Sequence, residues 1–308
     1  MNTPRLALAT TVWKRPELTR IVLAYYGEIR RRLADQIDLV LLAVGSEGAH
    51  SRKPCEEAGF HYIEHENEPV TYKWNRVIQE AQRYSPEGMV LVNSDDLVSM
   101  ELFPAFLDCF RRGLDYVGLK GTDIIDLMSL QFGTWPGYEA SFMKFRIGEP
   151  AGCGRGFSKR LLEKTNWRLW PPVPKKNSSM DFWCTQFVKL WGFEPRAFTM
   201  AELGVRAVQI KTDCNITTLN RLPLTDVGRG EQAFHLLEGI VGPEFTEQFR
   251  DLQRELAPAP GHAAPYHYSS ASRDPIHSIE EIPVSPEHGC TVTWMKAMRE
   301  AVLGEERP

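Results

Sequence analysis

The feature that most constrains the fold is a regular alternation of apolar runs and amphipathic segments in roughly the first 120 residues. Residues 6–12, 37–44 and 89–92 are apolar runs that suit buried strands. Between them, apolar residues recur every three or four positions, which predicts helices near residues 17–33 and 71–84. This alternation predicts an α/β protein with a mostly parallel central sheet and flanking helices.

The pattern changes further along the chain. Residues 1–115 carry the strand–helix alternation, whereas residues 116–220 are less regular and rich in aromatic side chains. Residues 221–256 are predicted to form a helical extension. Residues 257–275 have the composition of an extended linker. Residues 276–308 contain an amphipathic segment that is expected to dock on the protein's own body or on a second copy, which would allow a homo-oligomer.

The net charge and the scattered positions of the cysteines limit the classes of protein to which the chain can belong. The 36 Lys and Arg residues against 40 Asp and Glu residues give a net charge of −4, so the chain has no electrostatic footprint for non-specific nucleic-acid binding. No signal peptide and no run of about 18 apolar residues is present, so a cytoplasmic protein without a transmembrane segment is expected. Reduced, mostly buried thiols are predicted for the scattered cysteines, Cys55, Cys109, Cys153, Cys184, Cys214 and Cys290.

The clearest chemical motif follows the buried run at residues 89–92, where the sequence continues Asn93, Ser94, Asp95, Asp96. Two adjacent carboxylates at a strand end suit a hard divalent cation, Mn²⁺ or Mg²⁺. Such an ion would offset the charge that develops on a diphosphate leaving group. The alternative is that both aspartates simply open the next helix, where its dipole favours negative charge. In either case the polar residues that follow the runs at 6–12, 37–44 and 89–92 are expected to meet at one edge of the sheet.

Six short motifs lie at residues 9–16, 69–75, 94–96, 152–158, 179–182 and 210–217. In this order and spacing they resemble a family-2-like glycosyltransferase of the GT-A fold. The resemblance is closest to a bacterial and phage branch with a Lys-Trp-Asn helix before a Ser-Asp-Asp strand end. It implies a GT-A-type, Rossmann-like catalytic domain over residues 1–220, with a nucleotide-binding half at 1–115 and an acceptor half at 116–220.

The resemblance implies that Asp96 is the main metal ligand, and that Asp95 holds the ribose or assists the metal. The family's commoner Asp-x-Asp is replaced here by Asn93-x-Asp95 or by Ser94-Asp95-Asp96. This departure leaves weak metal binding, or metal independence, open.

The resemblance also implies a set of donor-binding residues. Thr10, Thr11 and Arg15 would lie under the nucleoside. Glu47 would contact the ribose or base, unless it is a solvated turn residue. Lys73 would place a point charge on the diphosphate, while Asn75 would hydrogen-bond nearby backbone. The remaining donor-binding residues of the prediction are Ser94, Gly154 and Arg155.

Gly154 and Arg155 lie in a glycine-rich stretch of residues 152–156. Glycines let backbone approach a ligand closely, and a guanidinium matches phosphate with a fork of donors. A plain strand-connecting turn is the alternative for the glycines.

Asp181 is the candidate general base, because an inverting transfer needs a carboxylate to take the proton of the acceptor hydroxyl. Ser178-x-x-Asp181 also has the spacing of a helix capping box, and the two roles are compatible. Trp135, Tyr138 and Trp170 have glycine or proline neighbours and are the candidates to line an acceptor site, although most aromatics of this region belong to the core.

The predicted function is transfer of a sugar from a nucleoside-diphosphate sugar, with UDP as the expected nucleotide, to a carbohydrate or other hydroxyl acceptor. Modified DNA remains an acceptor to test, although the acidic charge balance weighs against it. One alternative is a sugar-nucleotide nucleotidyltransferase, which usually carries a glycine-rich phosphate loop after strand one, whereas residues 10–16 contain no glycine. The other is a non-catalytic module that binds nucleotide or carbohydrate.

Overall fold

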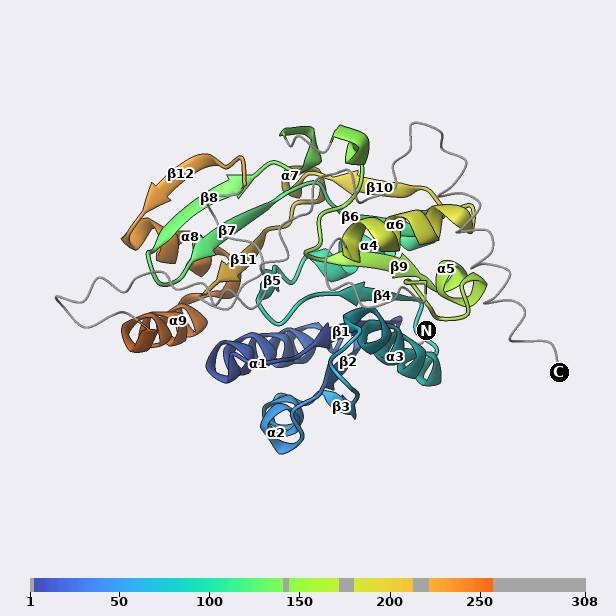
Figure 1. The fold of residues 1–308 in the computed structure, drawn as a ribbon, viewed down its shortest axis with the longest axis horizontal. Helices are drawn as coiled ribbons and strands as arrows, with labels where there is room; N and C mark the ends of the chain where they lie inside the picture. The colour runs from blue at the N-terminus through green and yellow to red at the C-terminus, as the bar shows by residue number, and fades with distance from the viewer. Residues whose placement is uncertain (1–2, 141–143, 172–179, 213–221, 257–308) are drawn as a thin grey trace.

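The computed structural model describes residues 3–140, 144–171, 180–212 and 222–256, and Figure 1 shows their arrangement. It confirms the predicted fold class, since helices flank a mostly parallel central sheet. Within these residues the main sheet has seven strands, in the order β10 (Pro195–Phe198), β6 (Tyr116–Leu119), β9 (Arg155–Ser158), β4 (Gly88–Leu91), β1 (Arg5–Thr11), β2 (Asp38–Gly45) and β3 (His61–Glu64).

The strand order changes direction around β1. The chain runs outward from β1 to β2 and β3 on one side, then returns to place β4 on the other side. β1 is parallel to both β2 and β4, so their carboxyl ends share one edge of the sheet. Such a switch in strand order is where ligands bind in open α/β sheets. β9 is inserted antiparallel between β4 and β6.

A second sheet lies beside the first and is visible at the left of Figure 1. It was not predicted, because its strands are short and pair segments that are far apart in the sequence, from residues 96–98 to residues 225–229. Its first strand begins at Asp96, so the strand-end motif leads directly from one sheet into the other. The order of its strands is β12 (Thr225–Arg229), β8 (Gln131–Trp135), β7 (Thr122–Asp126), β11 (Ala207–Lys211) and β5 (Asp96–Val98).

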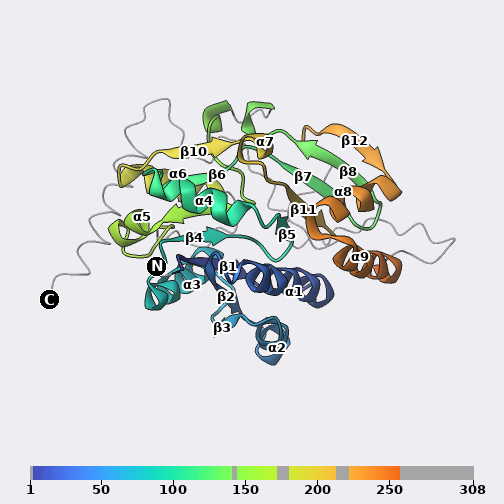
Figure 2. The ribbon, with the colours of Figure 1, turned by 180° about the vertical axis from the view of Figure 1, so that it is seen from behind.

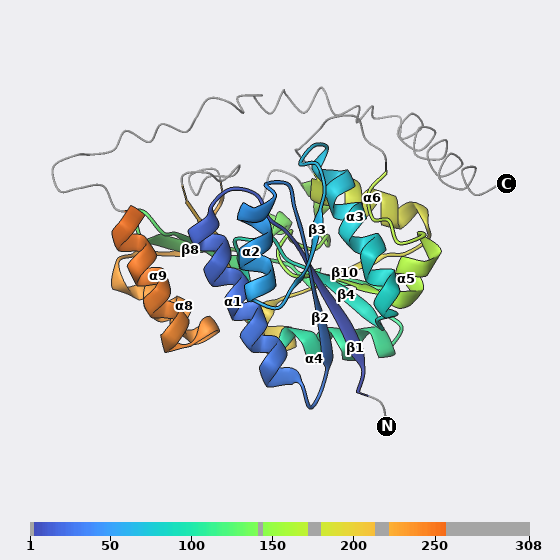
Figure 3. The same cartoon turned by 90° about the horizontal axis from the view of Figure 1, so that it is seen from below.

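Helices cover both faces of the main sheet, as Figures 2 and 3 show. One face packs on α1 (Pro16–Leu33), α2 (Ala49–Glu57) and α4 (Leu102–Arg111). The other packs on α3 (Val70–Ala81), α5 (Lys159–Lys164) and α6 (Met180–Leu190). The sequence did not predict α2, which is short, polar and interrupted by Pro54. Short 3₁₀ turns complete these regions, at η1 (Gln82–Tyr84), η2 (Tyr138–Ala140) and η3 (Lys144–Arg146).

The remaining helices are α7 (Met200–Leu203), α8 (Glu231–Val241) and α9 (Pro243–Leu256), and the last two form the helical extension. Tyr25 of α1, which packs on the main sheet, contacts both α8 and the second sheet. Its hydroxyl is a shared donor to the carbonyls of Val98 in β5 at 2.9 Å and of Ile240 in α8 at 3.1 Å. Its ring also packs edge-on against Phe245, with centroids 5.5 Å apart. The extension is therefore part of the same core.

Four predicted thiols, those of Cys55, Cys109, Cys153 and Cys184, are free and buried as expected. Cys214 lies outside the described residues, as does the whole segment 257–308 with Cys290, the predicted linker and the predicted amphipathic segment. None of the described helices combines the length and apolar character needed to cross a lipid bilayer.

Candidate active site

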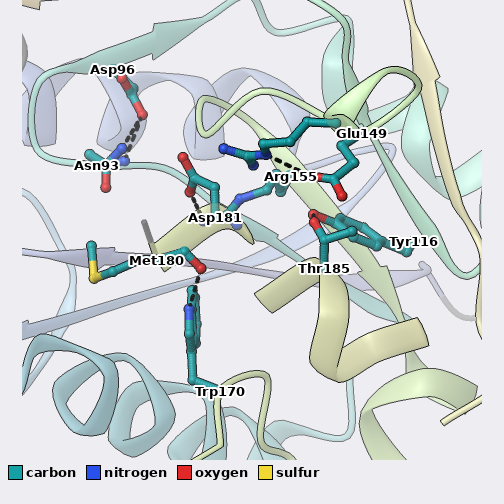
Figure 4. Close-up of polar contacts among 10 residues, drawn as sticks. Asn93, Asp96, Tyr116, Glu149, Arg155, Trp170, Met180, Asp181 and Thr185 are labelled. Carbon is teal, nitrogen blue, oxygen red and sulfur yellow. Dashed lines mark hydrogen bonds and ion pairs between the residues drawn. The ribbon is translucent and has the colours of Figure 1, made fainter. Parts of the chain in front are cut away.

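The strand-end motif forms a closed turn between β4 and β5. The backbone N–H and the side-chain amide of Asn93 both donate to Oδ2 of Asp96, at 3.0 and 2.7 Å (Figure 4). The hydroxyl of Tyr26 donates to the backbone carbonyl of Asp96 at 2.9 Å. Asp96 is fully buried, and burial, followed by the charge of Asp95, raises the pKa of its carboxyl. Asp96 therefore holds the turn from inside the protein.

Asp95 instead joins two cations. Its Oδ2 lies 3.2 Å from Nη1 of Arg15 and 3.8 Å from Nζ of Lys211. The other terminal nitrogen of Arg15 donates to Oγ of Ser94 at 3.3 Å. All three charged side chains are mostly buried, with exposed fractions of 17% for Arg15, 9% for Asp95 and 12% for Lys211. The structure thus brings together the predicted Arg15, Ser94 and Asp95.

Lys211 was named in the sequence only as part of the 210–217 motif and was not assigned a role. It is the last residue of β11, and the backbone N–H of Ile210 next to it donates to the carbonyl of Asp95 at 2.8 Å. This pairing of β11 with the segment before β5 positions the ammonium. No local sequence pattern reveals it, because residues 95 and 211 meet only through the second sheet.

Arg15 owes its position to a strained loop. Lys14 and Arg15 both have left-handed backbone conformations, with φ of 56° and 52°, which are uncommon for residues other than glycine. Pro16 then begins α1. Strained non-glycine residues are concentrated at ligand sites, where the surrounding structure over-determines them. This loop combines that backbone conformation with the contact of Arg15 with Asp95.

Glu47 lies against the same loop. Its Oε2 accepts the backbone N–H of Lys14 at 2.8 Å and the hydroxyl of Ser51 at 3.2 Å. A hollow of about 220 Å³ opens here, between the carboxyl ends of β1 and β2 and the helices that follow them. This volume is below the roughly 300–1,000 Å³ of a whole small-molecule site, so the hollow suits one ring of a ligand. It is lined by Val12, Trp13, Lys14, Pro16, Thr19, Glu47, His50, Ser51 and Pro54.

Lys73 is buried, and its ammonium hydrogen-bonds to three separate segments of the chain. Its ammonium donates to the carbonyl of Val12 at 2.8 Å, to Oδ1 of Asn67 at 3.0 Å and to Oγ of Ser46 at 3.3 Å. Burial lowers the pKa of Lys73 to about 8. These contacts match the three N–H donors of an ammonium. The predicted contact of Lys73 with a diphosphate stays a prediction.

Asn75 hydrogen-bonds to the backbone of residues 169 and 170. Its Oδ1 accepts the N–H groups of Leu169 and Trp170 at 3.0 and 3.2 Å, and its amide donates to the carbonyl of Trp170 at 2.8 Å. Thr10 is buried, and its hydroxyl has no hydrogen-bond partner among the described residues. Thr11 is half-buried at the end of β1. Donor contacts of Thr10, Thr11 and Asn75 stay predictions.

Arg155 and Asp181 form the second charged pair at this edge. In the sheet, Arg155 is paired with Leu91, close to the end of β4 and hence to Asn93. Its Nη2 lies 3.0 Å from Oδ1 of Asp181 in the first turn of α6 (Figure 4). Arg155 is buried, whereas the side chain of Asp181 is 35% exposed. The carboxylate is thus oriented by the guanidinium and open to solvent.

The glycine-rich stretch connects the two charged clusters. A Cβ on Gly152 would lie 2.8 Å from Oδ2 of Asp181, so a larger residue there would require that carboxylate to move. Gly154 has a φ of +65°, and a Cβ there would lie 3.1 Å from Val98. Between them, Cys153 is fully buried, and burial, followed by the charges of Asp96 and Asp95, raises the pKa of its thiol. The loop therefore packs closely against both clusters.

The three predicted acceptor aromatics are buried. Trp170 stacks on Trp74 with centroids 5.9 Å apart, and its indole N–H donates to the carbonyl of Met180 at 2.8 Å (Figure 4). Trp135 packs edge-on against Tyr138 at 5.1 Å. The exposed fractions of Trp135, Tyr138 and Trp170 are 8%, 5% and 1%. None presents an open ring face to a sugar in this structure, so the acceptor role stays a prediction for all three.

The residues at the strand end do not fit a resident divalent metal ion. Mg²⁺ in nucleotide sites needs only one or two carboxylates besides phosphate, so the number of ligands does not decide. The charges decide: Asp95 is already neutralised by Arg15 and Lys211, and Oδ2 of Asp96 is held by Asn93. A divalent cation at this place would be repelled by Arg15 and Lys211. Two like unit charges about 4 Å apart repel each other by about 4 kcal/mol at an effective dielectric constant of about 20. The described residues also contain no group of three potential ligands among His, Cys, Asp and Glu.

No protein-family model matches this chain, and no curated protein sequence matches it. Among solved structures, residues 1–349 of TarS from S. aureus share 9% identity over 82% of this chain and 73% of that chain, with a TM-score of 0.41. A cytidylyltransferase from Leptospira borgpetersenii shares 9% identity over 85% and 100%, with a TM-score of 0.40.

A third similar structure is glucosyl-3-phosphoglycerate synthase from Mycobacterium tuberculosis, in complex with Mn²⁺, UDP-glucose and phosphoglyceric acid. It shares 12% identity over 84% of this chain and 82% of that chain, with a TM-score of 0.40. Likenesses this distant leave the function to be inferred from the residues of the site itself.

Proposed function

We propose that the protein is a glycosyltransferase that moves a sugar from a nucleoside-diphosphate sugar to an acceptor hydroxyl. The observation that carries the proposal is that a cationic cluster and an accessible carboxylate lie at the same edge of the main sheet. Arg15 and Lys211 supply cations on one side, and the solvent-open carboxylate of Asp181 supplies a base on the other. A diphosphate leaving group and a hydroxyl nucleophile need these two kinds of group.

On the donor side, the hollow beside Glu47 takes one ring of the nucleoside, with UDP as the proposed nucleotide. Trp13 borders this hollow and is 45% exposed, so its ring is accessible for stacking. The diphosphate then extends along the end of β1 toward Arg15. In this arrangement the ligand passes the polar residues after β2, then those after β1 and then those after β4.

On the acceptor side, Asp181 takes the proton of the acceptor hydroxyl as its oxygen attacks the anomeric carbon. The new carbon–oxygen bond forms while the bond to the diphosphate breaks, and the electron pair of that bond leaves with the nucleotide. A single displacement of this kind inverts the anomeric centre. Arg155 holds the carboxylate of Asp181 in place, 3.0 Å away.

The proposal is tested by incubating the purified protein with UDP-glucose, UDP-galactose, UDP-N-acetylglucosamine and GDP-mannose, and measuring free nucleoside diphosphate. Many transferases slowly hydrolyse their donor, so this readout requires no known acceptor. A mixture of oligosaccharides and hydroxymethylated DNA is added in a second series. Release of UDP or GDP from one donor, increased by one acceptor class, is the expected result.

The donor series and one further incubation separate the alternatives. A nucleotidyltransferase would release pyrophosphate from a nucleoside triphosphate mixed with a sugar 1-phosphate, and would leave the nucleoside-diphosphate sugars intact. A non-catalytic module would bind a donor without turnover in either series. Either of these results would refute the glycosyltransferase proposal.

A further inference from the structure

We propose that Arg15 and Lys211 neutralise the diphosphate of the donor directly, so that this site binds its nucleotide without a divalent metal ion. The inference rests on the proposed function and adds to it the identity of the charges that hold the leaving group. It assigns a role to Lys211, and it replaces the metal that the Ser94-Asp95-Asp96 motif suggests.

The first support is the state of the two carboxylates. A metal ligand must offer an anionic oxygen to the ion, yet Asp96 is only 1% exposed and its Oδ2 accepts two hydrogen bonds from Asn93 inside the turn. Asp95 is the carboxylate at the cations, and its Oδ2 already lies 3.2 Å from Arg15 and 3.8 Å from Lys211. A divalent ion added there would meet these two cations as well as the carboxylates of Asp95 and Asp96.

The second support is the arrangement of the cations. They come from different parts of the fold, Arg15 from the loop before α1 and Lys211 from the end of β11, and both reach the same oxygen of Asp95. Two cations that converge on one anionic oxygen also suit the oxygens of a diphosphate. A diphosphate at this position would share these two cations with Asp95.

The third support is the donor capacity of Arg15. Its contacts to Asp95 and Ser94 engage the two terminal nitrogens, each of which carries two N–H groups. The fork can therefore keep both contacts and donate to a phosphate oxygen as well. Asp95 and Ser94 act as positioning residues for the guanidinium.

The experiment is calorimetric titration of the full chain with UDP and GDP, each in EDTA and in Mn²⁺. The wild type is compared with Lys211→Met, which removes the charge at similar length, and with Lys211→Arg, which keeps it. Lys159→Met is the matched control, because this exposed lysine starts α5 beyond Ser158, at the opposite end of β9 from Arg155. Uridine, which lacks phosphate, is the control ligand.

The expected result is nucleotide affinity that EDTA leaves unchanged, within about twofold, with Lys211→Met weakening UDP binding about tenfold or more. Lys211→Arg should retain most of the affinity. Uridine binding should be the same in Lys211→Met and wild type, since a merely structural lysine would weaken both ligands. Thermal unfolding of each variant confirms that it is folded.

Two results would overturn the inference and leave the proposed function standing. One is UDP or GDP binding that appears only with Mn²⁺, and the other is unchanged nucleotide affinity in Lys211→Met. Absence of binding by any nucleoside diphosphate in both EDTA and Mn²⁺ would instead refute the proposed function, and this inference with it.

Discussion

The guanidinium of Arg155 lies 3.0 Å from the carboxylate of Asp181, and the pair joins the first residue of β9 to the first turn of α6. Arg155 is fixed by its place in the sheet, opposite Leu91. Asp181 is therefore oriented from the main sheet. This orientation is what a general base requires, because proton transfer depends on distance and direction.

Asp181→Asn should lower kcat for sugar transfer by about 10²–10⁴-fold, since asparagine still accepts the hydrogen bond from Arg155 but cannot take a proton. The affinity for UDP should stay within about twofold of wild type, because the amide keeps the geometry. The measurements are initial rates of UDP release with acceptor and calorimetric titration. Glu163→Gln, an exposed carboxylate on α5, is the control. Full activity in Asp181→Asn would remove the base assignment.

Gly152→Ala should displace the carboxylate of Asp181, because the added Cβ would lie 2.8 Å from its Oδ2. A misplacement of about 1 Å can cost up to about 10²-fold in rate, so kcat should fall by at least about tenfold. Stability should change by less than about 1 kcal/mol, since a side-chain end can move. Gly239→Ala in α8 is the control, where the Cβ meets only Arg206. Unchanged kcat would show that transfer does not depend on the position of Asp181.

Substitutions of Trp170 distinguish a role in core packing from a role in acceptor binding. Trp170→Ala should lower the free energy of unfolding by about 3–5 kcal/mol, because the indole is fully buried against Trp74. Trp170→Phe should cost less, chiefly the hydrogen bond to the carbonyl of Met180. Urea unfolding followed by circular dichroism measures both. Near wild-type stability combined with a raised KM for the acceptor would instead support the acceptor role.

Lys73 should make stability depend on pH. Burial lowers its pKa from an ordinary 10.5 to about 8. Between these values the unfolded chain binds more protons than the folded protein, so the free energy of unfolding rises with pH through this window. The difference in stability between wild type and Lys73→Met should therefore shift in favour of wild type from pH 8 to pH 10.5. Urea unfolding at three pH values, with Lys159→Met as the control, measures this. A difference that is constant with pH would contradict the buried-ammonium arrangement.

Local sequence patterns predicted three strands of the main sheet and the edge at which its candidate site lies. The apolar runs at residues 6–12, 37–44 and 89–92 correspond to β1, β2 and β4, because buried parallel strands need continuous apolar residues. The convergence of Arg15 with Asp95 followed from the same pattern, since parallel strands bring their carboxyl ends to one edge. These are local patterns combined with a general rule of topology.

Which of the two carboxylates faces the cations depends on tertiary contacts. Asp95 and Asp96 are adjacent and chemically alike, so the sequence could not show that Asp96 closes a turn with Asn93 while Asp95 meets Arg15. Lys211 entered the site through pairing of strands more than one hundred residues apart, and non-local pairing leaves no periodic pattern in the chain. The burial of Trp170 depends in the same way on packing between distant elements, which only the folded chain establishes.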